Sequence, residues 1–336
     1  MNAKLGWGLI GASTIAHTWM VGAINTQPDS QVVSIMSSSP LRAQQFARTQ
    51  QIAHHCTALD DLLADPAVDV VYISTTNELH KEQALAAARA GKHVLCEKPL
   101  ALTLADAKEM VAACAKAGVV MGANHHLRNA VTHRTLRKLI ADGAIGQPLA
   151  ARVFHAVYLP PHLQGWRINA PQAGGGVILD ITVHDADTLR FVLNANVESV
   201  IAMEAQQGMA QGNLSDAVMG VMRFDNGVLA QFHDAFTIQH TGTGMQIHGT
   251  EGSLLAEDVM TQQPIGKIYL RRHAEVEEVQ TDPPENLYVR SVRLFNQAVK
   301  GQGQPAATAE DGIHSLAAAL AAAESARTGR SVAVEK

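Results

Sequence analysis

The sequence has few aromatic residues and few cysteines, and it contains no long apolar run. Aromatic side chains make up 4% of the 336 residues, whereas hydrophobic residues together make up 47%. This apolar fraction is normal for a globular chain, so we expect aliphatic side chains and alanine-rich helices to fill most of the interior. A chain of this length is predicted to form two domains rather than one.

The three cysteines, Cys56, Cys96 and Cys114, are odd in number and lack the close spacing of a zinc or redox motif. They are expected to be reduced structural thiols. The longest apolar run, at 316–323, is far below the roughly 20 residues that cross a bilayer. The N-terminal segment MNAKLGWGLIGAS is typical of a first strand and not of a secretion signal. We therefore expect a cytoplasmic protein with no membrane partner.

The sequence also lacks a cluster of basic residues. Its 26 Lys and Arg and 31 Asp and Glu residues are interspersed and give a formal net charge of -5. Nucleic-acid binding depends on phosphate contacts from grouped basic side chains. Nucleic acid is therefore not expected as a partner.

Short β-type runs alternate with helical patterns between residues 5 and 123. This alternation predicts a doubly wound parallel sheet with helices on both faces. After Gly143 longer alternating strands appear, with a hairpin turn at 225–227, which predicts a mostly antiparallel sheet. Helices are expected at roughly 177–194, 287–299 and 309–327. The predicted domains are 1–123 and an α+β domain at 124–336.

A glycine-containing segment, GLIGASTIAH at 8–17, joins the first predicted strand to the first helix. Compared with a dinucleotide fingerprint, Gly11 is the first glycine, Ser13 replaces the second, and Ala16 occupies the third position, where Ala is allowed. The backbone N–H of Ser13 still lies at a helix N-terminus, which favours an anionic pyrophosphate. A plain strand-to-helix turn is the alternative.

The end of the second strand has no acidic residue. NAD enzymes carry a carboxylate there for the adenosine ribose, whereas this chain has the serines 37–39 followed by Arg42, and no carboxylate at 30–59. A 2'-phosphate would meet hydroxyls and a guanidinium. The pattern favours NADP(H), although the serines alone are typical of a solvated turn and Arg42 of an exposed helix residue.

Polar residues follow three of the later strands, in STTNELH at 74–80, CEKP at 96–99 and GANHH at 122–126. Ligands of open parallel sheets bind beyond the carboxyl ends of the strands. We therefore expect Glu97 and Lys98 to face solvent and ligand in that crevice. A salt-bridged strand end is the structural alternative.

The segment GGGVILDITVHDAD at 174–187 is the second candidate site. In a helix, Asp180 and His184 are i and i+4 on one face, so the carboxylate could orient the imidazole. A capped surface helix is one alternative. A metal site with Asp180 and His184, to which Asp187 could be added, is another, but no third ligand stands at a recognisable spacing, and no metal is expected.

These motifs together resemble the glucose-fructose oxidoreductase, inositol dehydrogenase and rhizopine-catabolism (Gfo/Idh/MocA) family over essentially the whole chain. The resemblance implies an N-terminal Rossmann domain with a C-terminal α+β domain. It also implies that Lys98 lies by the nicotinamide and the substrate oxygen, that His184 transfers the proton, and that Asp180 lies beside it. The implied cofactor-binding residues are Gly11, Ala12, Ser13, Thr14, Ile15, Ser37, Ser38, Arg42, Thr75, Thr76, Asn77, Glu78, Leu79, His80, Glu97, Lys98, Asn124, Trp166, Arg167 and Tyr288.

Within that family the segment ARVFHAVYLPPHLQGWR at 151–167 is similar to a bacterial branch that reduces anhydro sugars. This implies NADPH-dependent reduction of the C2 ketone of 1,5-anhydro-D-fructose to 1,5-anhydro-D-mannitol, with Val157, Leu159 and Leu163 as apolar candidates near C1. An NADP-linked polyol or inositol dehydrogenase is the alternative enzyme, and a non-catalytic NADPH- and sugar-binding regulator is the alternative of another class. Both monomer and homo-oligomer stay open.

Overall fold

The computed structural model describes residues 4–335, which divide into two compact units. The first unit comprises the described residues up to His126 together with Tyr288–Ile313, and the second comprises Leu127–Leu287 and the described residues from His314 onward. The chain thus returns to the first unit at Tyr288 and re-enters the second at His314. The sequence-based boundary between residues 123 and 124 does not include this return.

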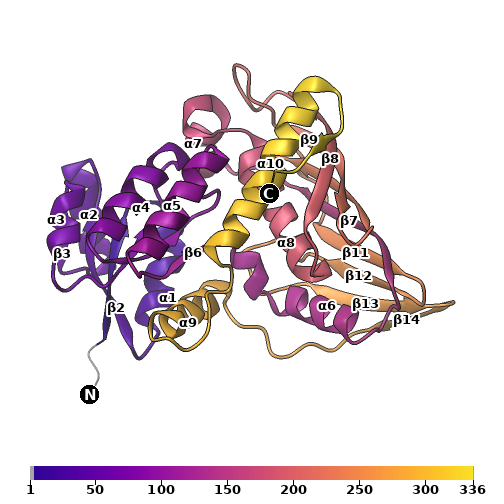
Figure 1. Cartoon of the computed structure of the whole chain (residues 1–336), viewed down its shortest axis with the longest axis horizontal. Helices are drawn as coiled ribbons and strands as arrows, with labels where there is room; N and C mark the ends of the chain where they lie inside the picture. Colours follow the sequence, from indigo (N-terminus) through magenta and orange to yellow (C-terminus); the bar gives the residue numbers. More distant parts are fainter. Residues whose placement is uncertain (1–3, 336) are drawn as a thin grey trace. The chain divides into compact units, whose positions relative to one another are not determined.

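The first unit contains a six-stranded sheet in which every pairing is parallel and whose order is β3-β2-β1-β4-β5-β6. Figure 1 labels β2, β3 and β6 of this sheet. β4 is fully buried, as parallel strands covered on both faces must be. The predicted doubly wound sheet is confirmed. Its strands are β1 (Leu5–Ile10), β2 (Ser30–Met36), β3 (His54–Cys56), β4 (Val70–Ile73), β5 (His93–Cys96) and β6 (Met121–Ala123).

Helices follow these strands as the alternating pattern predicts. Two of them have side-chain caps: Ser39 Oγ accepts from Arg42 N at the start of α2, and Thr103 accepts from Asp106 N at the start of α5. The helical segments in this part of the chain are η1 (Ala16–Met20), α1 (Val21–Asn25), α2 (Pro40–Gln50), α3 (Leu59–Ala64), η2 (Asn77–Leu79), α4 (His80–Arg89) and α5 (Leu104–Lys116).

The returning helix α9 (Leu287–Val299) packs on the first strands of the sheet. The Phe295 ring lies 5.5 Å from that of Trp7 in β1, and Asn296 donates to Ser30 Oγ over 3.1 Å. Trp7 and Phe295 are fully buried. Helix α9 therefore completes the core of the first unit although it is far away in sequence.

The second unit contains a nine-stranded sheet of order β14-β13-β12-β11-β7-β10-β9-β8-β15, in which only β7 and β10 pair in parallel. The mostly antiparallel sheet is confirmed, as is the hairpin at 225–227, where Gly227 has a φ of 87°. The strands are β7 (Pro148–Ala156), β8 (Val197–Ala205), β9 (Ala217–Phe224), β10 (Leu229–Ala235), β11 (Gly244–Gly249), β12 (Ser253–Glu257), β13 (Lys267–Arg272), β14 (Glu275–Glu278) and β15 (Val332–Ala333).

The expected helix at 177–194 is observed as a π-type turn followed by α8, whose residues are almost all buried. The other two expected helices are α9 and α10 (Ala309–Thr328). α8 packs between α6 and the sheet. The remaining helical segments are η3 (His126–Asn129), α6 (Val131–Ala141), α7 (Pro161–Asn169), η4 (Pro171–Ala173), η5 (Ile178–Thr182) and α8 (Val183–Leu193).

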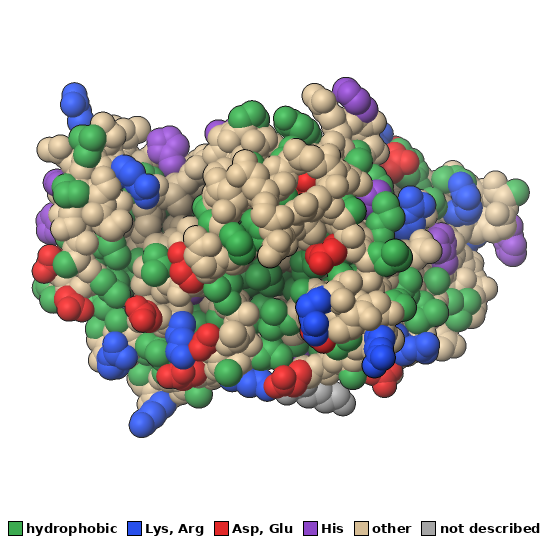
Figure 2. Space-filling view, turned by 90° about the horizontal axis from the view of Figure 1, so that it is seen from above, with side chains coloured by type: hydrophobic (Ala, Val, Ile, Leu, Met, Phe, Trp, Pro, Cys, Tyr) green, Lys and Arg blue, Asp and Glu red, His purple; other side chains and the backbone are tan. Residues whose placement is uncertain are grey.

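The surface carries charges of both signs. Figure 2 shows Lys and Arg side chains interspersed with Asp and Glu on the face in view, in agreement with the composition. Among the helices of residues 4–335, none combines the length and hydrophobicity that a membrane crossing requires.

Candidate active site

A tight turn after β1 places the first candidate cofactor residues. Gly11 has a φ of 105°, and a Cβ added there would lie 3.1 Å from the carbonyl group of Ser74. Only glycine fits this position. Ser13 Oγ accepts from Ala16 N over 3.1 Å and lies 2.7 Å from Ser74 Oγ. The hydroxyl that replaces the usual second glycine thus turns toward its own helix and the end of β4.

At the end of β2 the serines make local bonds. Ser37 is buried, and its Oγ accepts from Ser39 N, whereas Ser38 and Arg42 are exposed. A surface hollow lies nearby, and the carboxylate of Asp61 is part of its lining. Its lining residues are Pro40, Leu41, Gln44, His55, Cys56, Thr57 and Asp61.

The residues that follow β4 are held by local contacts. Thr75 Oγ1 donates to Gln83 over 2.7 Å, and Thr76 donates to Glu78 over 2.8 Å. His80 is fully enclosed, with Nδ1 3.0 Å from Pro99 O and Nε2 3.3 Å from Thr75 O. Burial lowers the pKa of His80. A neutral imidazole carries one N–H, so the ring packs between the loops that follow β4 and β5 and donates to one of these two carbonyls.

Glu97, directly after β5, does not face solvent as expected. Its side chain is buried, and Oε1 accepts from Tyr72 OH over 2.5 Å and from Asn124 Nδ2 over 2.6 Å. Ser291 of α9 donates to Asn124 Oδ1 over 3.0 Å. Burial raises the pKa of Glu97, and these two donors and Lys98 offset part of that rise.

Lys98 follows Glu97, is half-buried, and is joined to Pro99 by a cis peptide bond. The candidate residues of the first unit thus lie at the carboxyl ends of β1, β2, β4, β5 and β6, which is where open parallel sheets bind ligands. Tyr288 of α9 is also buried in this unit, stacked between Trp19 and His126 at ring distances of 5.3 and 5.1 Å.

In the second unit, Arg167 connects two of the candidate residues. Its Nε donates to Asp180 Oδ2 over 3.1 Å, and its guanidinium lies 4.8 Å from the centre of the Trp166 ring. A Cβ at Gly175 would lie 2.7 Å from Trp166 O, so the glycine segment allows close approach of the two backbones. The sequence motif paired Asp180 with His184 only and missed Arg167 as a partner of this carboxylate.

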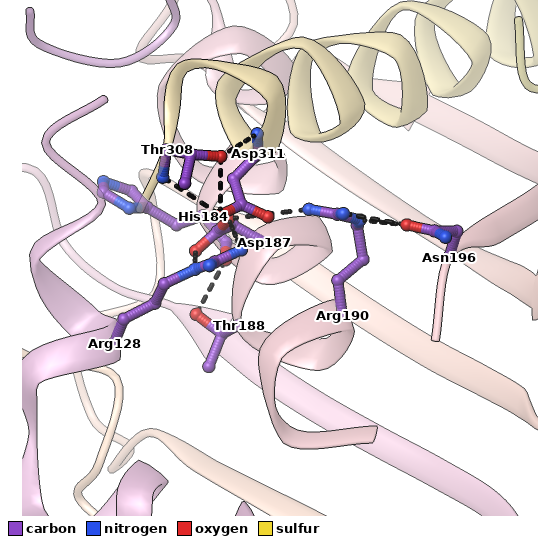
Figure 3. A network of polar contacts seen from close by, with 8 residues as sticks. All are labelled: Arg128, His184, Asp187, Thr188, Arg190, Asn196, Thr308 and Asp311. Atoms are coloured by element: carbon purple, nitrogen blue, oxygen red, sulfur yellow. Dashed lines mark hydrogen bonds and ion pairs between the residues drawn. The ribbon is translucent and has the colours of Figure 1, made fainter. Parts of the chain in front are cut away.

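His184 lies in the first turn of α8 and is 7% exposed. Its backbone carbonyl accepts from Thr188 Oγ1 over 2.8 Å (Figure 3). Its ring centroid is 6.3 Å from that of His155 in β7, and His155 Nδ1 lies 2.8 Å from Asp185 Oδ1. Sequence reasoning did not select His155 or Asp185, because a contact between residues 30 positions apart leaves no local pattern.

Asp187 forms a buried ion pair rather than an open ligand position. Arg128 Nε and Arg128 Nη2 donate to its two oxygens over 2.8 and 2.7 Å, and Arg190 Nη1 lies 3.9 Å away (Figure 3). Within residues 4–335 there is no group of three or more His, Cys, Asp or Glu arranged to hold a metal. Asp187 therefore holds α8 against Arg128.

Comparison with known proteins identifies the fold family. A family model described as "Oxidoreductase family, NAD-binding Rossmann fold" matches residues 5–125, and a "GFO/IDH/MocA C-terminal domain" model matches residues 133–255. The chain belongs to the Gfo/Idh/MocA oxidoreductase family. It is an enzyme of the oxidoreductase class, and the resemblance inferred from its motifs is confirmed.

Three similar proteins define its place among relatives. A 1,5-anhydro-D-fructose reductase of Ensifer adhaerens is 57% identical over 98% of both chains. A myo-inositol 2-dehydrogenase of Thermotoga maritima is 30% identical over 82% of this chain and 83% of the relative. A solved levoglucosan dehydrogenase in complex with NADH and levoglucosan superimposes with a TM-score of 0.88 at 25% identity, over 99% of this chain and all (100%) of that one.

The buried Glu97 network gives a stability prediction. Glu97→Leu should lower the free energy of unfolding by about 1–3 kcal/mol for each donor left without an acceptor, Tyr72 OH and Asn124 Nδ2. Glu97→Gln keeps an acceptor oxygen and should lose much less. Chemical denaturation of both variants provides the measurement, and an equal loss would mean that the charge rather than the two hydrogen bonds matters.

Proposed function

We propose that the chain catalyses NADPH-dependent reduction of the C2 ketone of 1,5-anhydro-D-fructose to 1,5-anhydro-D-mannitol. The observation that carries this proposal is the 57% identity, over 98% of both chains, to a 1,5-anhydro-D-fructose reductase. The proposal is also supported by a lysine after a Rossmann strand and by a buried histidine in the first turn of α8.

The residues of the first unit fit a dinucleotide. The turn at Gly11 leaves no room for a Cβ and leads into a helix N-terminus, which is the environment that a pyrophosphate requires. The loop at 11–15 and the segment at 75–80 would hold the cofactor, with Glu97 supporting them from inside. When bound, the reduced nicotinamide supplies the hydride.

His184 and Lys98 have different roles at the ketone oxygen. His184 donates the proton to the oxygen of the ketone as it becomes a hydroxyl, and the ammonium of Lys98 stabilises the negative charge that develops on that oxygen. Asp180 carries a negative charge that Arg167 holds in place through the 3.1 Å contact. In this proposal His184 donates the proton, Lys98 stabilises the developing charge, and Asp180, held by Arg167, contributes to positioning.

The preference for NADPH is proposed from the absence of an acid at the end of β2. Ser38 and Arg42 are both exposed there and can reach a 2'-phosphate, whereas the hydroxyls of Ser37 and Ser39 are engaged in the local turn. The Asp61 carboxylate in the neighbouring hollow works against binding of a phosphate in that hollow. We therefore assign the phosphate to the Ser38 and Arg42 side.

The substrate is proposed to meet apolar side chains near C1. A 1,5-anhydroketose has no anomeric hydroxyl, and the segment after β7 offers half-buried Val157 and Leu163 beside buried Leu159. An apolar site rejects an added hydroxyl by only about 10²-fold. Weak activity on related 2-keto sugars is therefore part of the proposal.

The cofactor assignment predicts that Arg42→Ala weakens NADPH binding. A charge-assisted hydrogen bond contributes about 1.5–3 kcal/mol, so the dissociation constant should rise by roughly 10- to 150-fold. NADH binding should stay nearly unchanged. Fluorescence titration of both cofactors measures this, with Arg48→Ala on the exposed side of the same helix as the control. Equal losses for both cofactors would contradict the assignment.

The role of His184 predicts a loss of turnover with little change in cofactor affinity. Removing a general acid in His184→Ala should lower kcat by about 10²- to 10⁴-fold, because proton donation is lost at the reacting oxygen. Steady-state kinetics and NADPH titration test this, with exposed His240→Ala as the matched control. Near-normal turnover would leave Lys98 as the next candidate for proton donor.

The reaction itself is tested by product analysis. Reduction of 1,5-anhydro-D-fructose with deuterated NADPH should place deuterium on one face of C2 and yield the manno epimer alone, as NMR can show. A mixture of epimers or anhydroglucitol would overturn the product assignment. Faster NADP⁺-linked oxidation of myo-inositol would favour the dehydrogenase alternative, which the 30% identical inositol enzyme represents. A lack of turnover on any ketose would favour the non-catalytic regulator.

A further inference from the structure

Two buried aspartates lie behind His184, and the proposed reaction does not use them. Asp185 follows His184 in α8, and Asp234 lies in β10 opposite His155 of β7 in the parallel pairing of the two strands. Asp185 and Asp234 are both completely buried. They approach from a helix and a strand, and their carboxyl groups interact with each other.

One oxygen of each aspartate lacks a hydrogen-bond partner unless a proton lies between the two carboxyl groups. Asp185 Oδ1 lies 2.8 Å from His155 Nδ1, and Asp234 Oδ2 accepts from Thr182 Oγ1 over 2.6 Å. The other oxygens, Asp185 Oδ2 and Asp234 Oδ1, find no donor among the described residues 4–335. Two adjacent carboxyl groups bond to each other only when one of them carries a proton.

The surrounding charges balance one negative charge but not two. His155 from β7 and Thr182 from η5 face the pair. His133 of α6 interacts electrostatically with His155, but burial lowers the pKa of His133 to about 4, so His133 is neutral at ordinary pH. The one remaining carboxylate of α8 in this region, Asp187, is already paired with Arg128. His155 is therefore the partner for a single charge on the pair.

We propose that Asp185 and Asp234 hold one proton between them, and that the remaining negative charge orients His155 against the ring of His184. The first half of this inference concerns the protein alone. The second half rests on the proposed function and makes Asp185, Asp234 and His155 positioning residues for the histidine that transfers the proton. Burial raises the pKa of both aspartates, and Asp185 raises that of Asp234 further.

The shared proton has a spectroscopic test that needs no substrate. An infrared difference spectrum of the wild type minus Asp234→Asn, recorded near neutral pH, should contain the C=O band of a protonated carboxylic acid. Taking the difference removes any contribution from Glu97, whose pKa is also raised. If the difference shows only ionised carboxylate bands, the shared proton is overturned.

The same variant gives a stability measurement with a defined sign. Because the folded-state pKa values of the pair lie above the ordinary value of 3.8, ionisation disfavours the folded state as pH rises through them. Asp234→Asn removes this second ionisation and keeps the shape. Its melting temperature relative to the wild type should therefore increase as pH rises from the ordinary pKa of 3.8 through about 7, the raised pKa of Asp185. A difference that stays constant with pH would overturn the shared proton.

The positioning role is tested by moving the charge. Asp185→Asn shifts the negative charge from the carboxyl that contacts His155 to its neighbour, whereas Asp234→Asn keeps it on Asp185. Asp185→Asn should lower kcat more, by up to about 10²-fold, with KM little changed. Asp234→Asn should chiefly move the alkaline limb of the kcat profile to higher pH. Exposed Asp282→Asn is the matched control.

The outcomes separate the two halves of the inference from the proposed function. Equal kcat values and equal pH profiles in the two variants, with only the melting temperatures changed, would overturn the positioning role. If the wild type shows the carboxylic acid band but reduces no ketose, the shared proton is supported, whereas the proposed function and the positioning role are both overturned.

Discussion

The buried carboxylate of Glu97 organises the nucleotide-binding unit. A charge in a protein interior is tolerated only where hydrogen-bond donors replace water. Tyr72 at β4 and Asn124 after β6 supply those donors, and Ser291 of α9 supports Asn124. One carboxylate thus joins three neighbouring strand ends to the returning helix. The position of Lys98, the next residue in the chain, follows from this arrangement.

Much of the fold could be predicted from sequence because its signals are local. Alternating strand and helix patterns predicted the parallel sheet, and the turn residues at 225–227 predicted the hairpin between β9 and β10. The return of α9 to the first unit was not predicted, since its contacts between Phe295 and Trp7 join residues at opposite ends of the chain. Periodicity identifies a helix and its apolar face but not the surface that this face covers.

For the candidate site, too, contacts between residues far apart in the sequence could not be predicted. Motifs selected Lys98, Asp180 and His184, and in the structure His184 lies on a largely buried helix. The prediction that Glu97 faces solvent was wrong. A side chain at a strand end can point either to solvent or to hydrogen-bond donors in the interior, and the sequence does not show those donors. Asp234 was missed for a related reason: its contact with Thr182 spans 52 positions and joins a strand to a different helical segment.

The buried acids of the two units are stabilised in three different ways. Asp187 has a guanidinium partner, Glu97 has neutral donors, and Asp185 has a carboxyl neighbour. Burial raises the pKa of Glu97 and of the aspartate pair, so the stability linked to these groups is complete at low pH and is lost as pH rises. Surface acids with lowered pKa values, such as Asp29 beside Lys300, behave in the opposite sense and lose their contribution as pH falls. Because the surface pairs are screened by solvent and the buried acids are not, the alkaline side should report mainly on the interior of the protein.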